Sequence, residues 1–480
     1  MQIVTVPPSG VPADKTSAVT IAGWAALLVI PPAVYLLALA SRLSTQSSIF
    51  AALLSATVLM WMFSLVDEFV PPLVAIVAAL IIGLAPPTVA LAGFSSPSML
   101  LLLGVFALSA VISFSGLSYR LILRLLLRLP DRPFWHQAAL LISGYLLSPL
   151  MPSANARLSL LKPVYKDMVA GLQLPRRGPA ITALLASMFG GAVLFGPMMV
   201  TSKSSNIAAI TVLPSQLQAE FGGFFWLVAA AVAAATITAA HLIVVRARFP
   251  TNSQATMSRG DVRQRLADMG PASPSEWVAA GSFVFFLLGI ATVPWHHVKP
   301  PYLAGCVLLA LLVTGTLGKR DFQRRVDWPM IFFLLGIDSL MRVMDHLGLA
   351  QALARVMRRW FDFIDGEVGL LLLATLLVTA TLRLVLPVSA GMLTSIAILL
   401  PIATAQGINP WVVVFGAAVF SDMSFLPHQG TNGILQMRSG GLLDDVDQRG
   451  FQQYNLLMNA ARVAAVYASI PWWTFLGLLR

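Results

Sequence analysis

Two stretches carry the strongest pattern in the first half of the chain: PSANARLSLLKP (Pro152 to Pro163) and GGAVLFGPMMVTSKSSN (Gly190 to Asn206). Similar stretches follow in the second half, PVSAGMLTSIAILLP (Pro387 to Pro401) and FSDMSFLPHQGTN (Phe420 to Asn432). Each copy has a loop of small residues, an apolar arm closed by proline, and a span whose polar residues end at an asparagine. This recurrence predicts an internal repeat.

The composition places the chain in a membrane. Of its 480 residues, 58% are hydrophobic and only 11% are charged, whereas a soluble protein carries about 25% charged residues. Such a chain could not cover its surface with polar groups in water, which excludes a soluble enzyme, a disordered regulator and a nucleic-acid binder. The apolar residues suffice for about ten to twelve transmembrane helices. We therefore expect an all-α polytopic membrane protein.

The net charge of +11 is explained by arginines and lysines in short loops, which favour the cytoplasmic side. The residues concerned lie in three basic segments: Arg120, Arg124, Arg128 and Arg132; Arg246, Arg248, Arg259, Arg263 and Arg265; and Lys319, Arg320, Arg324 and Arg325. All three can be cytoplasmic if residues 133–170 form a hairpin that enters and leaves on that side. The N-terminus is then cytoplasmic and the C-terminus is outside, in the plasma (inner) membrane.

An odd number of crossings then separates the two hairpins, so the second hairpin opens to the opposite side. This is an inverted-topology repeat, the arrangement that lets a central site face either side of the membrane in turn.

Three further stretches resemble a known family. They are ALAGFSSPSMLLLLGVFALSAVISFSGLSYRL (Ala90 to Leu121), HQGTN (His428 to Asn432) and the terminal SIPWWTFLGLL (Ser469 to Leu479). They are similar to the divalent-anion/sodium symporters of the ion-transporter superfamily. The resemblance implies about eleven transmembrane helices, two re-entrant hairpins, a scaffold domain, a mobile transport domain and a homodimer.

This resemblance divides the chain into six segments. They are a polar tail (1–19), scaffold spans of the first repeat (20–132), the first hairpin with transport-domain helices (133–245), a cytoplasmic linker (246–275), scaffold spans of the second repeat (276–345), and a surface helix, second hairpin, broken helix and last span (346–480).

The resemblance also implies the binding residues, because the hairpin tips of that family carry a Ser-Asn-Thr type of motif. The predicted substrate-binding residues are Ser153, Asn155, Lys203, Asn206, Ser389, Thr431 and Asn432. The second tip departs from the motif and has no asparagine. Amide and hydroxyl groups at half-helix N-termini suit a carboxylate or sulfate. Oxygen donors suit a sodium ion, which we expect at Ser153, Asn155, Ser202 and Asn206.

Lys203 stands where the family usually has a neutral residue, and a charge inside a membrane usually has a function or a partner. Either it supplies positive charge that sodium would otherwise bring, or it snorkels or pairs with Asp422 or Asp338. Three other cations, Arg157, Lys162 and Lys166, are expected to face the cytoplasm.

Three residues are candidates for coupling. Arg383 precedes the second tip and can meet substrate from outside. Asp422 is one of two carboxylates expected near the membrane midplane. His428 either carries a proton or forms a neutral hydrogen bond in its loop.

The sequence thus predicts a secondary transporter that moves a small anion, either a di- or tricarboxylate or an oxyanion such as sulfate, by elevator-type alternating access. Sodium or protons are the expected coupling ions, and no cofactor is expected. The alternatives are a sodium/proton antiporter or metalloid-oxyanion transporter of the same superfamily and, more remotely, a membrane-embedded lipid enzyme. The sequence lacks the clustered carboxylates or histidines that such an enzyme would need.

Overall fold

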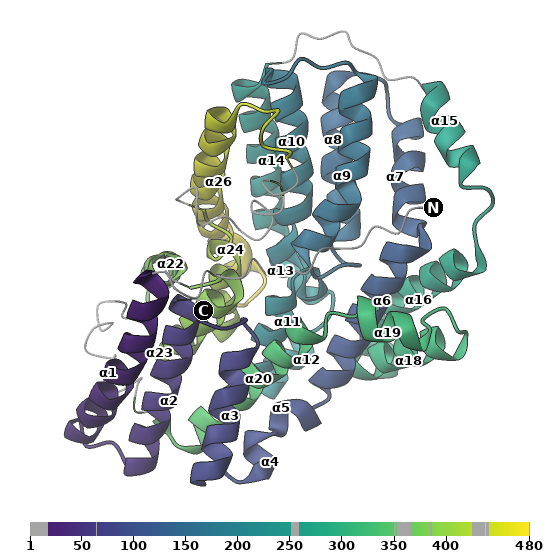
Figure 1. Ribbon diagram of the computed structural model, residues 1–480. Coiled ribbons are helices and arrows are strands. Elements are labelled where there is room, and N and C mark those ends of the chain that lie inside the picture. The colour runs from purple at the N-terminus through teal and green to yellow at the C-terminus, as the bar shows by residue number, and fades with distance from the viewer. Residues whose placement is uncertain are drawn as a thin grey trace.

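The computed structural model describes residues 18–63, 65–250, 259–349, 366–384, 386–424 and 441–479, together with Ala352, Ile364 and Met437. Its elements are helices, and no strand occurs within these residues (Figure 1). The prediction of an all-helical membrane protein is confirmed.

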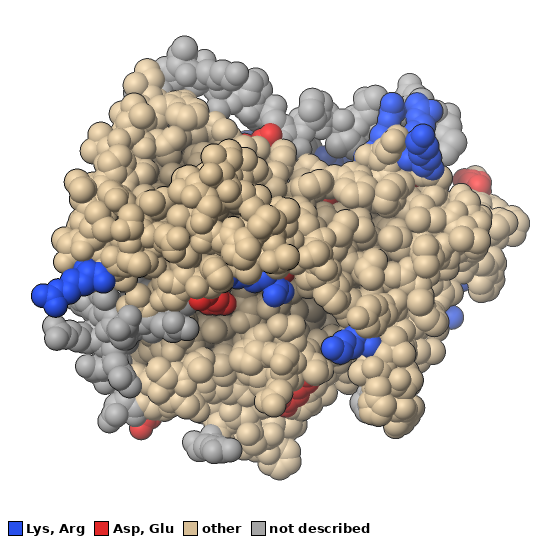
Figure 2. Space-filling model, turned by 90° about the horizontal axis from the view of Figure 1, so that it is seen from below, with Lys and Arg blue, Asp and Glu red and all other residues tan. Residues whose placement is uncertain are grey.

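Seven helical segments of the described chain are long and apolar enough to cross a membrane. They are Thr20–Ala40, Thr45–Met62, Ser98–Ser115, Pro179–Met198, Ala231–Arg248, Pro274–Ala291 and Val388–Ala405. Large apolar side chains such as Leu28, Ile81 and Val313 lie on the outside of the molecule. Figure 2 shows a face on which lysine, arginine, aspartate and glutamate are few. Such a surface is stable in lipid and costly in water.

The described chain begins with seven helices. They are α1 (Ala18–Ala40), α2 (Thr45–Met62), α3 (Val70–Ile82), α4 (Pro87–Ala90), α5 (Ala92–Ser95), α6 (Ser98–Ser115) and α7 (Leu117–Arg128). Gly116, with φ of 89°, separates α6 from α7. Only glycine adopts this conformation without strain, so the chain turns sharply there.

The first repeat unit follows. It contains α8 (Pro133–Leu147), α9 (Ala154–Gly171), α10 (Pro179–Val193), the short 3-10 turns η1 (Gly196–Met198) and η2 (Val200–Ser202), and α11 (Ser204–Thr211). Helices α12 (Ser215–Phe221), α13 (Phe225–Ala229) and α14 (Ala231–Arg248) complete this half. Helices α8 and α10 approach each other closely at Gly144 and Gly191. A Cβ added to Gly144 would lie only 2.2 Å from the carbonyl carbon of Gly191.

The described helices of the second half follow. They are α15 (Arg259–Asp268), α16 (Pro274–Ala291), α17 (Val293–His296), α18 (Pro300–Val313), α19 (Lys319–Arg325), α20 (Trp328–His346), α22 (Val368–Arg383), α23 (Val388–Ala405), α24 (Pro410–Phe420), α26 (Gln448–Ala468) and α27 (Ile470–Phe475). In the predicted repeat, helices α22, α23 and α24 would correspond to α8, α9 and α10. In Figure 1 the two groups lie in different parts of the molecule, and α11 contacts both α23 and α24.

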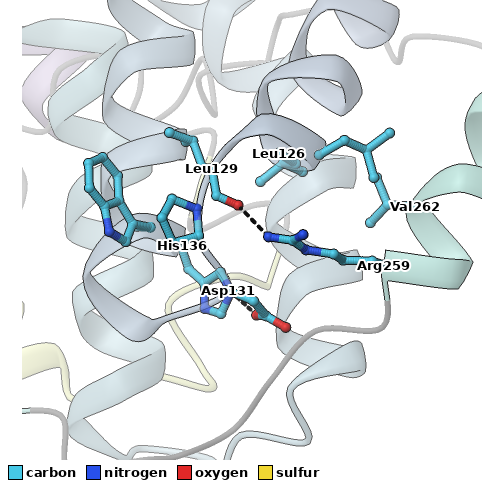
Figure 3. A pocket seen from close by; sticks show the side chains of 9 residues that line it. Leu126, Leu129, Asp131, His136, Arg259 and Val262 are labelled. Atoms are coloured by element: carbon cyan, nitrogen blue, oxygen red, sulfur yellow. Dashed lines mark hydrogen bonds and ion pairs between the residues drawn. The ribbon is translucent and has the colours of Figure 1, made fainter.

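One residue from each of the three basic segments makes a contact near the C-terminal end of α6, at α7 or at the start of α16. Arg120 forms a buried ion pair with Glu276 at 2.5 Å, and the guanidinium of Arg325 lies 4.7 Å from the ring centre of Phe114. Figure 3 shows a small pocket between α7, α8 and α15, where Arg259 donates to the Leu129 carbonyl at 3.0 Å. The orientation predicted from the positive-inside rule requires the three basic segments to lie on the same side of the membrane. Which side of the membrane the segments face stays a prediction.

Candidate functional site

The tip of the α8–α9 pair contacts the broken span of the same repeat. Ser153 caps α9, and its hydroxyl accepts a hydrogen bond from the Ala156 amide at 3.4 Å. The amide of Ser204 donates to the Pro152 carbonyl at 3.1 Å. Asn155, in the first turn of α9, has a buried Oδ1 for which no partner is found among the described residues. Two stretches predicted to share a site are therefore neighbours.

Asn206 is completely buried and holds the unwound chain between α10 and α11 in place. Its Nδ2 donates to the carbonyls of Gly196 and Met199, at 2.9 and 3.0 Å. The Asn206 amide group thus gives a hydrogen-bond donor to two backbone carbonyls of the unwound chain. Inside a bilayer, an unsatisfied backbone group costs several kcal/mol. Its Oδ1 lacks a partner among the described residues. The same holds for Thr201 Oγ1, Ser202 Oγ and Ser205 Oγ.

The expectation that Arg157 faces the cytoplasm is wrong. Its side chain is 1% exposed and donates to three backbone carbonyls. Nε donates to Ala192 at 2.7 Å, while Nη1 donates to Ser202 at 2.8 Å and also to Met151. The guanidinium is buried inside the protein because carbonyls of the tip, of α10 and of η2 all accept hydrogen bonds from it. Of the other two cations, Lys166 is exposed and Lys162 is half-buried.

Lys203 connects the two repeats. Its ammonium donates to Asp422 Oδ1 at 2.8 Å, to Ser421 Oγ at 2.9 Å and to the Ala418 carbonyl at 3.2 Å. The last two groups belong to the C-terminal end of α24, where the helix dipole favours a cation. Lys203 therefore pairs with Asp422. The alternative pairing with Asp338 is wrong, because that carboxylate binds Arg342 at 3.2 Å.

Arg383 and Arg462 are the other buried cations near Asp422. Arg383, the last residue of α22, donates to the Ser421 and Leu386 carbonyls, each at 2.8 Å. Arg462, on α26, donates to Asn459 Oδ1 at 3.3 Å. Arg383 and Arg462 are 5% and 4% exposed, respectively. The expectation that Arg383 meets solutes near the second tip stays a prediction.

Together Arg157, Lys203, Arg383 and Arg462 form what we call the cation cluster. All four interact electrostatically with the Asp422 carboxylate, and Arg383 also interacts with Glu68. A methyl group placed on Gly196 would lie 3.6 Å from Arg157 Nη2 and 4.0 Å from both Asp422 Oδ2 and Lys203 Cδ. Among the described residues, four cations thus face two carboxylates, and the cluster has an excess of positive charge.

The remaining predicted residues lie at the second repeat. Ser389 is half-buried in the first turn of α23, and Gly391 of that turn lies close to the Arg383 side chain. His428, Thr431 and Asn432 lie outside the described residues. The cluster residue that sequence reasoning missed altogether is Arg462. A signal was present, since an arginine in the apolar stretch of α26 indicates a function or a partner.

A cavity of about 210 Å³ reaches the first tip from the end of α6 that carries the basic segments. Its polar lining comes from Ser109 and Ser113 of α6, from Ser153 at the tip, and from Arg325 and Asp327 before α20. This cavity separates α6 from the hairpin tip and brings open space to Ser153.

A buried, positively charged centre between two repeats of a membrane protein is suited to an anion. The sequence profile of a citrate transporter family matches residues 58–420. The chain belongs to this citrate transporter family. Its members are membrane transporters rather than enzymes, so the lipid-enzyme alternative is wrong. The resemblance to transporters of the ion-transporter superfamily is confirmed.

Two curated relatives are membrane proteins. The inner membrane protein YbhI of Escherichia coli is 23% identical over 62% of this chain and 64% of its own length. A membrane protein of Cupriavidus necator is 24% identical over 52% of this chain and 49% of its own. The chain therefore spans less than two thirds of either relative.

The YdaH transporter of Alcanivorax borkumensis shares the fold, with a TM-score of 0.55 and 14% identity over 82% of this chain and 89% of that chain. The citrate transporter family, together with the apolar helices of the described chain, indicates a multi-pass membrane transporter.

Proposed function

We propose that this member of the citrate transporter family is a secondary active transporter for a small anion that carries two or three negative charges. The observation that supports the proposal is the cation cluster, in which buried positive charge exceeds negative charge. Charges inside a membrane protein are costly unless they have a function or a partner. An anionic solute at the cluster would supply the missing countercharge.

The first substrates to test are di- and tricarboxylates, citrate among them because of the family, and then inorganic oxyanions such as sulfate. Guanidinium groups favour carboxylate and oxyanion geometry, because their paired N–H donors match two oxygens. A sodium/proton antiporter is less well supported. Its carboxylates should be free to exchange protons, whereas Asp422 and Asp338 both form ion pairs.

The proposed mechanism is elevator-type alternating access. The two hairpin-containing repeat units would move together against the scaffold helices, which include α6 and α20. The cavity between α6 and the first tip supports this division, because it provides a path to the tip from one end of the molecule. We further propose two re-entrant hairpins, a cytoplasmic N-terminus, a C-terminus outside and a homodimer, which cysteine labelling and native mass measurements would test.

The proposed coupling ion is sodium, with protons as the alternative. Support comes from the first repeat, where oxygens of Asn155, Ser202 and Asn206 have no partner within the described residues. Neutral oxygens are the ligands that hard cations prefer. Ser153 contributes less, because its hydroxyl already caps α9. The fixed charge of Lys203 would stand in for a second sodium ion.

Uptake by the purified protein in proteoliposomes tests these proposals. We expect saturable uptake of a labelled di- or tricarboxylate, reduced when sodium is replaced by choline. Lys203→Gln should lower the uptake or change its cation requirement, whereas Lys166→Gln, which changes an exposed lysine, should leave both unchanged. Absence of flux for every anion tested would refute the transport proposal, and an unaltered Lys203→Gln variant would remove Lys203 from it.

A further inference from the structure

The Asp422 carboxylate pairs with Lys203 of the cation cluster, in a position where the substrate would bind. We propose that Asp422 is an internal counter-ion that holds Lys203 when the site is empty and that the incoming anion displaces. This inference rests on the proposed anion transport and identifies Asp422 as a residue that sets the affinity and specificity of the site.

The guanidinium groups of Arg157 and Arg383 are held by backbone carbonyls. Arg157 is bound to three carbonyls from three separate segments, and Arg383 is bound to two. These hydrogen bonds fix the two cations whether or not a solute is present. Nη2 of Arg157 and Oδ2 of Asp422 both lie near Gly196, 3.6 and 4.0 Å from a methyl group placed on that residue. A guanidinium held in this position can also donate to a carboxylate of the incoming anion.

Asp422 is attached less firmly. Its one hydrogen bond in the described structure joins Oδ1 to Lys203, and it lies in the non-helical residues 421–424 directly after α24. Helix α24 itself is anchored, since all its residues from Trp411 to Phe420 are buried. The carboxylate can therefore turn away by rotating its side chain, while the helix end that carries Ser421 and Ala418 stays in place.

The Asp422 carboxylate affects the energy of both the empty and the loaded site. In the empty site Asp422 reduces the excess of buried positive charge, which would otherwise be costly. In the loaded site a substrate carboxylate beside Asp422 would be a like charge at close range, which disfavours binding. Asp422 and the anion therefore compete for Lys203. Only a ligand with enough negative charge and a carboxylate-like end can win that competition.

The test compares Asp422→Asn with wild-type protein in anion binding and in transport. We expect Asp422→Asn to bind citrate or succinate at least about tenfold more tightly, because a like charge is removed from the site. We also expect it to retain anion exchange but to lose net uptake, because the empty carrier must then move with an uncompensated cluster. In a Lys203→Gln background the gain in affinity should largely disappear.

The matched control is Asp338→Asn, which removes a buried, ion-paired carboxylate outside the cluster and should leave affinity unchanged. Should Asp422→Asn fail to fold, Asp422→Glu keeps the charge, and its affinity should stay within about threefold of wild type. Tighter binding by Asp422→Glu, or unchanged or weaker binding by a folded Asp422→Asn, would overturn the proposal while leaving anion transport intact. A wild-type protein that binds and moves no anion would refute both.

Discussion

Replacing Arg157 with methionine should destabilise the first repeat unit. Methionine keeps a long side chain at this position and leaves the apolar surroundings unchanged. The guanidinium joins the tip of the α8–α9 pair, the end of α10 and η2 through carbonyls of Met151, Ala192 and Ser202. Hydrogen bonds from a charged donor contribute about 1.5–3 kcal/mol each, and a buried acceptor left alone costs about 1–3 kcal/mol.

Part of this loss is offset, because burying a charge itself costs several kcal/mol and Arg157→Met removes that charge from a site with excess positive charge. We therefore expect the free energy of unfolding to fall by about 3 kcal/mol. The assay is unfolding of the purified protein in detergent micelles, by denaturant titration followed with tryptophan fluorescence.

The matched control is Lys162→Met, which removes a half-buried cation from the same helix. It should change the unfolding free energy by less than about 0.5 kcal/mol. An Arg157→Met variant as stable as Lys162→Met would show that the three carbonyls do not depend on the guanidinium, and would refute the role assigned to Arg157.

Three further outcomes follow from the packing and charges. Glu276→Gln should lower the free energy of unfolding by about 3 kcal/mol, because it leaves Arg120 buried without its carboxylate; a melting temperature equal to that of wild type would contradict this. Gly144→Ala should cost about 2 kcal/mol or more, since its methyl group would collide with α10, whereas Gly281→Ala, which meets no atom within 4 Å, should be harmless in the same melting assay. Arg462→Gln should weaken anion binding about tenfold, because it removes one buried cation from the site; calorimetry with unchanged affinity would exclude Arg462 from the site.

Composition and the recurring pattern were sufficient to predict the helical membrane fold and the contact between the first tip and its broken span. Lys203 could be identified as a buried charge, because its neighbours in sequence are those of a polar break in an apolar helix. For its ion-pair partner, the sequence leaves two carboxylates, Asp422 and Asp338. The choice depends on where α24 ends relative to η2, which the sequence does not specify.

Arg157 shows why sequence reasoning failed elsewhere. It lies close to Lys162 and Lys166, and a run of cations after a hairpin tip is typical of a cytoplasmic loop. Its burial depends on carbonyls at positions 151, 192 and 202, which come together only in the folded chain. Asn206, predicted as a ligand, has Nδ2 bound to the unwound backbone and Oδ1 unpaired in the described structure, and its role as a ligand stays a prediction.

The most direct measurement is an electron cryomicroscopy structure of the full chain in lipid nanodiscs with a bound di- or tricarboxylate. We predict density for the anion within hydrogen-bond distance of Lys203 Nζ and Arg157 Nη2, with the Asp422 carboxylate turned away from Lys203. Anion density away from the cation cluster, or an Asp422–Lys203 pair that persists beside a bound anion, would contradict the view that buried charge from both repeats forms the transport site.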